Sequence, residues 1–134
     1  MRLQHFCGTL LIASTLLTAG ACTSTKPAAG QRGYTEAGKA SYYSNKLHGR
    51  KMANGEAYNR RKLTAAHRTL PFGTKVKVTN LQTKKSVKVS ITDRGPFVKG
   101  RLIDLSEAAA KRLDYISAGI VPVEVRVVKP APVR

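Results

Sequence analysis

Three segments of the chain alternate apolar and polar residues with a period of two, which is typical of β-strands with one buried face. Valine or isoleucine occupies every second position in residues 75–79, 86–92 and 121–127. The polar stretch 80–85 joins the first two segments, so we expect them to form a hairpin. Pro122 has no N–H to donate and is expected at a strand start or edge.

One short helix and one further strand complete the expected elements. Ser106 is a suitable N-cap, Glu107 favours the positive end of a helix, and residues 108–113 continue it. Residues 40–44 are a candidate for another short strand. Many short strands with one helix predict a mainly β domain, folded as a small closed or half-closed barrel that leaves few exposed sheet edges.

The 134 residues suffice for one domain but not for two. Residues 22–33 are small, polar and rich in Pro and Gly, which predicts a flexible tether. The folded domain is expected over residues 34–128, followed by a frayed tail at 129–134.

The N-terminal segment has the layout of a secretory signal peptide. No Lys, Arg, Asp or Glu lies between Arg2 and Lys26, and an apolar stretch ends in small residues. Residues 1–21 are therefore expected to direct export and to be removed. Hydroxyl residues and glycine dilute the apolar stretch, which disfavours a stable membrane-spanning helix.

Residues 19–22, Ala-Gly-Ala-Cys, resemble a bacterial lipoprotein box, although Ala19 stands where leucine is usual. The same residues fit ordinary signal cleavage. We favour acylation of Cys22, because it explains an unpaired cysteine in an exported chain whose other cysteine, Cys7, is lost with the signal. The expected product is a lipid-anchored protein that faces the periplasm, with Thr23 favouring the outer membrane.

The charge is strongly basic, with 24 Lys and Arg against 7 Asp and Glu and a net charge of +17. Such a field favours polyanionic partners. Export argues against nucleic acid as the partner and favours cell-wall polymer or an anionic lipid surface. Two cysteines exclude a disulfide-rich scaffold, and the absence of a Cys-His cluster in the sequence argues against a zinc site.

Three side chains are candidates for a functional role. Asp93 follows a hydrophobic strand and opens a Gly-Pro turn, which is a suitable place for a catalytic acid. The alternative is a turn-capping Asp93 paired with Arg94 or Arg101. His67 is either a cleft residue or a satisfied histidine at the barrel mouth, and Glu56 is either a cleft residue or part of a surface turn. Asp104 is read as a structural anchor.

An ordered set of motifs covers most of residues 38–128 and resembles the rare lipoprotein A family. The motifs are Gly38–Tyr43, Asn54–Tyr58, Leu63–His67, Thr69–Thr74, Val76–Asn80, Asp93–Phe97 and Arg101–Ser106. The resemblance implies a six-stranded double-psi β-barrel. It also implies an endolytic peptidoglycan lytic transglycosylase that acts on peptide-stripped glycan strands, often at the division septum.

By the same resemblance, Asp93 matches the principal catalytic acid, and Glu56 and His67 match other important cleft residues. Arg94, Tyr58 and Arg68 are the expected substrate-binding residues. The family's chemistry needs no metal or organic cofactor, and a monomer is expected.

The position of Arg94 decides which carboxyl group suits the acid role. A catalytic acid must hold a proton near neutral pH, whereas a neighbouring cation favours the ionised form. If Asp93 is the acid, the Arg94 guanidinium must point elsewhere. If the two side chains pair, Glu56 becomes the better candidate. A non-catalytic, expansin-like wall-binding module and a lipid-bound basic protein remain the alternatives to an enzyme.

Overall fold

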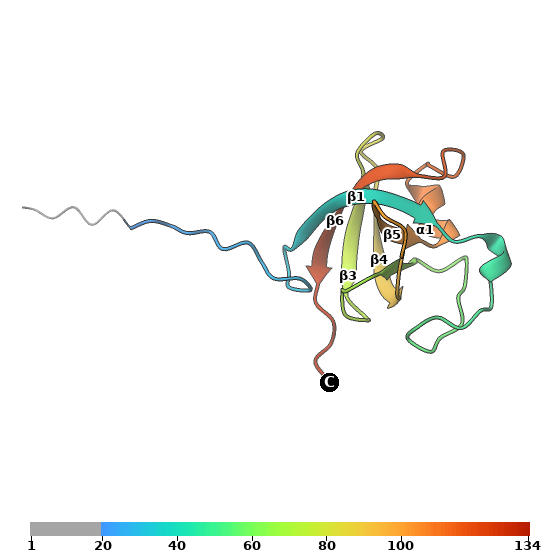
Figure 1. Cartoon of the computed structure of the whole chain (residues 1–134), viewed down its shortest axis with the longest axis horizontal. Coiled ribbons are helices and arrows are strands. Elements are labelled where there is room, and N and C mark those ends of the chain that lie inside the picture. The colour runs from blue at the N-terminus through green and yellow to red at the C-terminus, as the bar shows by residue number, and fades with distance from the viewer. Residues whose placement is uncertain (1–19) are drawn as a thin grey trace, which may run out of the picture.

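A computed structural model describes residues 20–134 as six strands, one α-helix and one 3-10 helix (Figure 1). The elements are β1 (Thr35–Tyr42), η1 (Asn45–Leu47), β2 (Thr64–His67), β3 (Lys75–Asn80), β4 (Ser86–Asp93), β5 (Arg101–Leu105), α1 (Glu107–Arg112) and β6 (Val121–Lys129). The predicted signal sequence lies outside the described residues except for its last two positions.

The strands close into a barrel in the order β1-β5-β2-β4-β3-β6. The pairs β1–β5 and β2–β4 are parallel, and the other four pairs are antiparallel. Closure gives each of the six strands a neighbour on both sides, so no sheet edge is left exposed. The expected mainly β fold, a six-stranded double-psi barrel with one short helix, is confirmed.

Two strands, β2 and β5, do not alternate buried and exposed residues along their length. All four residues of β2 are buried, so this strand shows no polar face, and β5 is a short run with two adjacent buried residues. The first strand begins at Thr35, five residues before the predicted start. The short β2 was missed because a strand buried on both sides carries no periodic signal in the sequence. The start of β1 was missed for another reason: none of its first five residues is buried, so no apolar alternation marks it.

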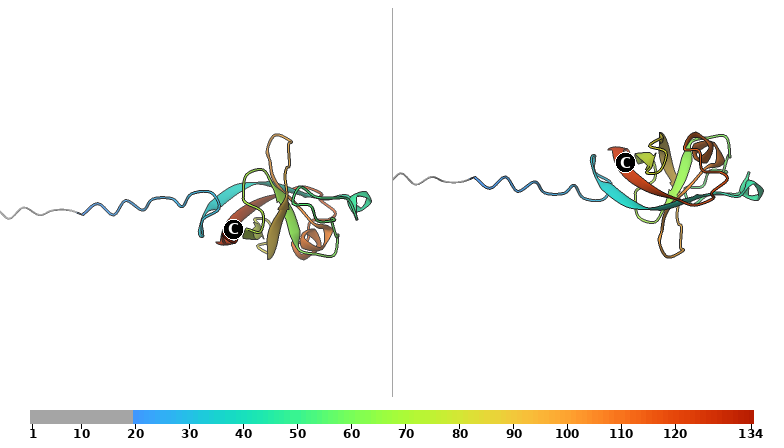
Figure 2. Two further views of the ribbon diagram at one scale, coloured as in Figure 1. Left: turned by 90° about the horizontal axis from the view of Figure 1, so that it is seen from below. Right: turned by 90° about the horizontal axis from the view of Figure 1, so that it is seen from above.

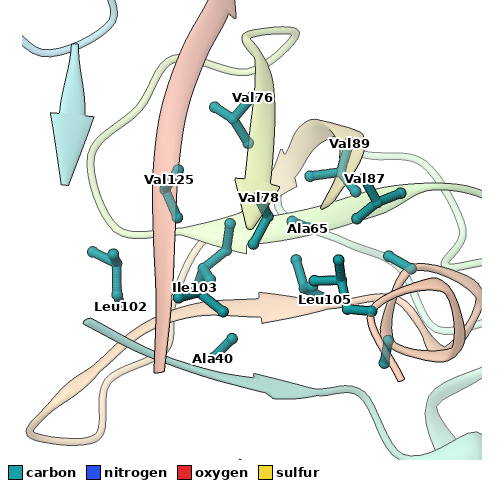
Figure 3. Close-up of a cluster of buried hydrophobic side chains, with 14 of the residues drawn as sticks. Ala40, Ala65, Val76, Val78, Val87, Val89, Leu102, Ile103, Leu105 and Val125 are labelled. Atoms are coloured by element: carbon teal, nitrogen blue, oxygen red, sulfur yellow. The ribbon is translucent and has the colours of Figure 1, made fainter. Parts of the chain in front are cut away.

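The core fills the barrel with aliphatic side chains from all six strands (Figure 3). The alternating valines of β3, β4 and β6, among them Val78, Val89 and Val125, point inward, as the sequence pattern predicts. Core residues and strands all lie within residues 35–129, so a chain of residues 23–134 contains the whole fold.

The helix α1 packs against β1, β4 and β5. The Ser106 hydroxyl accepts a hydrogen bond from the Ala109 N–H at 3.3 Å, which confirms the predicted cap. Glu107 occupies the first turn, and Lys111 and Arg112 the last turn, where each charge complements the helix dipole.

Residues 20–29 form no regular secondary structure and lead away from the barrel at the end opposite η1 (Figure 2). Within the part of the chain that the structure describes, no helix has the length and apolar character needed to span a bilayer.

Candidate active site

Asp93 is the last residue of β4 and faces a hollow of 160 Å³. In the parallel pair with β2 it lies opposite Ala66, just after an irregularity in the register. The hollow is lined by side chains from the β1 end, η1 and the loop that follows: Tyr43, Leu47, Arg50, Lys51, Met52 and Tyr58. Its only carboxyl group is that of Asp93.

Three donors fix the Asp93 carboxylate. Its Oδ1 accepts hydrogen bonds from the N–H groups of Ala53 and Arg94, both at 2.8 Å. Its Oδ2 accepts from the Tyr43 hydroxyl at 2.6 Å. Burial first, and the neighbouring Asp93 second, raise the pKa of Tyr43 well above its ordinary value. Tyr43 therefore stays protonated and continues to donate.

Tyr43 packs against Tyr58, with ring centroids 4.7 Å apart. Tyr58 is almost fully buried, and its hydroxyl accepts a hydrogen bond from the Glu107 N–H at 3.2 Å. The two rings form one wall of the Asp93 hollow. Tyr58, expected from the sequence to bind substrate, thus lies in the hollow but is also tied to the start of α1.

The Arg94 side chain points away from the Asp93 carboxylate. Its guanidinium donates to the carbonyl groups of His67 and Leu70, at 3.1 and 2.8 Å, and lies 3.9 Å above the centre of the Phe72 ring. Arg101 is engaged elsewhere too, with Asp104 at 3.3 Å. Of the two arrangements considered from the sequence, the structure has the one in which the Arg94 and Asp93 side chains do not pair.

His67 is buried beside β4 and is fully occupied by protein contacts. Its Nδ1 accepts from the N–H groups of Thr69 and Leu70 at 3.2 and 3.1 Å, which leaves the proton on Nε2 to be donated to Glu36 at 2.9 Å. Burial lowers the pKa of His67, while Glu36 opposes that shift. The ring is therefore held neutral and shapes the turn that binds Arg94.

Glu56 lies outside the Asp93 hollow. It is exposed and lines a neighbouring hollow of 540 Å³ together with His48 and Lys62. The two hollows share Met52 and Tyr58 as lining residues. A ligand long enough to cross this shared wall would meet both carboxyl groups.

On its other side, the Asp93 hollow adjoins a groove of 940 Å³, with Tyr43 and Leu47 shared between them. Asp104 lines this groove, where it accepts hydrogen bonds from the Ser41 hydroxyl and from Arg101. The anchoring contacts agree with the structural role read from the sequence. Asp93 thus occupies the middle of three adjoining hollows.

The two remaining predicted residues lie elsewhere. Arg68 follows β2 and is exposed, and Cys22 is an exposed, free cysteine in the segment that precedes the barrel. Among residues 20–134, no three His, Cys, Asp or Glu side chains cluster closely enough to hold a metal ion.

Sequence reasoning missed Tyr43 and Glu36, which contact the two predicted residues Asp93 and His67. Each partner lies far away along the chain, and Tyr43 reaches Asp93 because β1 ends near the end of β4. The adjacent tyrosines at 42 and 43 were a usable signal, since one of the two had to leave the core side.

Comparisons with known proteins agree with this architecture. A family model described as lytic transglycolase matches residues 35–125. Proteins named endolytic peptidoglycan transglycosylase RlpA are 51% identical over 96 residues in Campylobacter jejuni and 50% over 97 residues in Vibrio cholerae. Each alignment covers 72% of this chain, but only 35% and 37% of these relatives.

Two solved structures resemble the barrel. The expansin of Clavibacter michiganensis has a TM-score of 0.57 and 28% identity, over 73% of this chain and 52% of the expansin. A papain inhibitor of Streptomyces has a TM-score of 0.60 and 24% identity, over 73% of this chain and 97% of the inhibitor, and shows a shared fold alone. The family match spans all of β1 to β5 and most of β6, so the chain belongs to the lytic transglycolase family.

Proposed function

We propose that this chain is an endolytic peptidoglycan lytic transglycosylase that cleaves between N-acetylmuramic acid and N-acetylglucosamine. The observation that carries the proposal is the Asp93 carboxyl group, the single carboxyl group lining its hollow, held by Tyr43 and by two backbone N–H groups while the Arg94 side chain is turned away. The relatives that share about half of their aligned residues carry the same activity in their names.

In the proposed reaction, one carboxyl group serves first as acid and then as base. Asp93 gives its proton to the glycosidic oxygen as the bond from this oxygen to C1 of muramic acid breaks. The C6 hydroxyl oxygen of the same muramic acid then bonds to C1, and its proton passes to Asp93. The product carries a 1,6-anhydro end, no water is consumed, and the acid is regenerated.

The surrounding residues divide the remaining work. Tyr43 fixes the reacting carboxyl group, and Glu56 meets the substrate beyond the shared wall of Met52 and Tyr58. His67 acts as a positioning residue, because both of its ring nitrogens already have protein partners. It shapes the turn whose carbonyl groups hold Arg94.

Hollows on both sides of Asp93 support cleavage within a strand rather than at its end. A polymer bound across the middle hollow needs room for sugars in both directions. Peptide-stripped glycan fits the proposal best, since it still carries the lactyl carboxylates of muramic acid that a basic protein attracts.

The test is digestion of peptide-stripped glycan strands by residues 23–134, with the products read by mass spectrometry. We expect anhydro-ended fragments, one water lighter than hydrolysis products, and a loss of roughly 100- to 10,000-fold in rate for Asp93→Asn. The matched control is Asp114→Asn, which changes an exposed carboxyl group on the α1 side. Hydrolytic ends would contradict the transglycosylase mechanism.

The second candidate is a non-catalytic wall-binding module. The observation that favours it is the likeness to an expansin, one structure of which holds cellohexaose. Under this candidate, the wild-type chain binds insoluble peptidoglycan but releases no fragments, and Asp93→Asn changes nothing in either measurement.

We further propose that the chain is exported, acylated at Cys22 and held as a monomer at the periplasmic face of the outer membrane. The exposed position of Cys22, well before β1, supports this. Mass spectrometry of the mature N-terminus should find a lipid-modified Cys22, which Cys22→Ser abolishes. An unmodified N-terminus after residue 21 would establish plain secretion instead.

A further inference from the structure

The outer surface of β4, β3 and β6 carries cations directly opposite one another. In the strand register, Lys88 of β4 pairs with Lys77 of β3, and Lys77 pairs with Arg126 of β6. Lys75 of β3 pairs in the same way with Lys129 of β6. All five side chains are exposed. Together with Arg32, which joins Lys77 and Arg126 around a hollow of 240 Å³, they form what we call the cationic face.

These cations are not neutralised by the barrel itself. Within residues 20–134, none of the six takes part in an ion pair. Glu124 is the single acid at the outward positions of the three strands. Like charges directly opposite in a sheet destabilise it, so the arrangement costs stability unless an anionic partner covers it.

The cationic face lies where the tether joins the barrel. Arg32 lines its hollow and stands ten residues after Cys22, a distance of at most about 35 Å when fully extended. The tether leaves the barrel at the end opposite η1, whereas Leu47 of η1 lines the Asp93 hollow (Figures 1 and 2). The two hollows have no lining residue in common.

We propose that the cationic face docks on an anionic lipid bilayer. Clusters of Lys and Arg beside a membrane attachment point bind acidic headgroups through charge complementarity, without a shaped pocket. The outward positions of β3, β4 and β6 carry no aromatic side chain on which a sugar ring would stack. This composition favours a lipid surface over a glycan strand as the occupant.

Docking in this way gives the barrel a fixed orientation. The bilayer covers the cationic face, and the three hollows around Asp93 stay free to meet a polymer outside the membrane. This consequence rests on the proposed function, whereas the lipid contact itself does not depend on activity.

The test measures the partition of residues 23–134, which lack any lipid, onto vesicles of phosphatidylglycerol and phosphatidylethanolamine and onto vesicles of phosphatidylcholine alone. The face variant is Lys77→Gln, Lys88→Gln and Arg126→Gln. The matched control removes three exposed cations from other parts of the surface, Arg61→Gln, Lys99→Gln and Arg112→Gln. Both variants have the same net charge, and circular dichroism checks their folding.

The wild-type domain should bind the anionic vesicles, release them at high salt, and show no binding to phosphatidylcholine vesicles. At low salt we expect about fivefold weaker partition for each face cation removed and about a hundredfold for all three. The control variant should lose less than about fivefold in total, because its charges lie away from the contact.

Three outcomes would overturn the proposal: no binding by the wild type, equal losses in the two variants, or a face variant that loses peptidoglycan binding while keeping vesicle binding. The last outcome would assign the face to the glycan. Glycan cleavage is measured separately, so an inactive domain that still binds vesicles would contradict the proposed function and leave the docking proposal standing.

Discussion

At the scale of single residues, the site depends on holding one carboxyl group still. Tyr43 is the only side-chain donor to Asp93 among the described residues, and its hydroxyl lies 2.6 Å from Oδ2. A hydrogen bond to a charged group contributes about 1.5–3 kcal/mol. Removing it frees the carboxyl group to rotate away from the productive geometry.

We therefore predict that Tyr43→Phe lowers kcat on glycan strands by about 10- to 100-fold and changes KM far less. The ring and its packing on Tyr58 remain. The matched control is Tyr42→Phe, whose hydroxyl donates to the Ile116 carbonyl at 3.1 Å. Equal effects of the two substitutions in steady-state kinetics would show that Tyr43 does not act through Asp93.

His67 makes stability depend on pH. Burial lowers its pKa below the ordinary 6.5, so the unfolded chain takes up a proton at a higher pH than the folded one. The stability that the neutral ring contributes is complete above about pH 6.5 and is lost as the pH falls, by at most about 1.4 kcal/mol per pH unit.

Urea unfolding across this pH range would measure that loss. His67→Gln should flatten the pH dependence, whatever it does to stability at neutral pH. Glu36→Gln should extend the loss to lower pH, because Glu36 opposes the shift in the His67 pKa. An unchanged slope in His67→Gln would mean that other groups, such as the carboxylates, cause the acid sensitivity.

At the scale of elements, β1 and β5 leave no room for a side chain at Gly38. A Cβ added at Gly38 would lie 2.7 Å from the Leu102 Cβ, too close for the parallel pair to keep its spacing. We predict that Gly38→Ala lowers the free energy of unfolding by about 1–3 kcal/mol in urea titrations.

The control for this prediction is Ala37→Ser, at an exposed position of the same strand. It should change stability by less than about 0.5 kcal/mol. If Gly38→Ala unfolds at the wild-type urea concentration, the two strands have room to separate and the close approach is not a constraint on the fold.

The elements also show which signals the sequence carries. Alternating valines identify β3, β4 and β6, because each of these strands has one solvent-exposed side and one buried side. The same rule misses β2, which is buried on both sides. Ser106 identifies the helix start, since a cap is a local contact.

For the site, its place at a strand end made Asp93 one of three candidates, and only the family resemblance gave it the acid role, which stays a prediction. The direction of the Arg94 side chain could not be predicted from the sequence, because it depends on the carbonyl groups of His67 and Leu70 at the turn after β2. Glu36 could not be found for the same reason: its contact with His67 exists only once β1 and β2 are placed in the barrel.

At the scale of the whole molecule, the net charge of +17 is distributed unevenly over the surface. The Asp93 hollow has its own cations, Arg50 and Lys51, whereas the cationic face shares no lining residue with it and lies elsewhere on the barrel. Long-range charge attracts an anionic polymer and raises its local concentration, but it contributes little to a proton transfer confined to one hollow.

This separation predicts how salt affects the reaction. Raising the ionic strength from low values to about 0.15 M shortens the screening length to about 8 Å, so the positive charge of the domain as a whole attracts the glycan less. The KM for peptide-stripped glycan should rise steeply while kcat at saturating substrate stays nearly constant.

Chitooligosaccharides lack lactyl carboxylates, and their binding should hardly respond to salt. If kcat falls in parallel with affinity, the cations act within the reacting site itself, and Arg50 and Lys51 beside Asp93 become the residues to substitute.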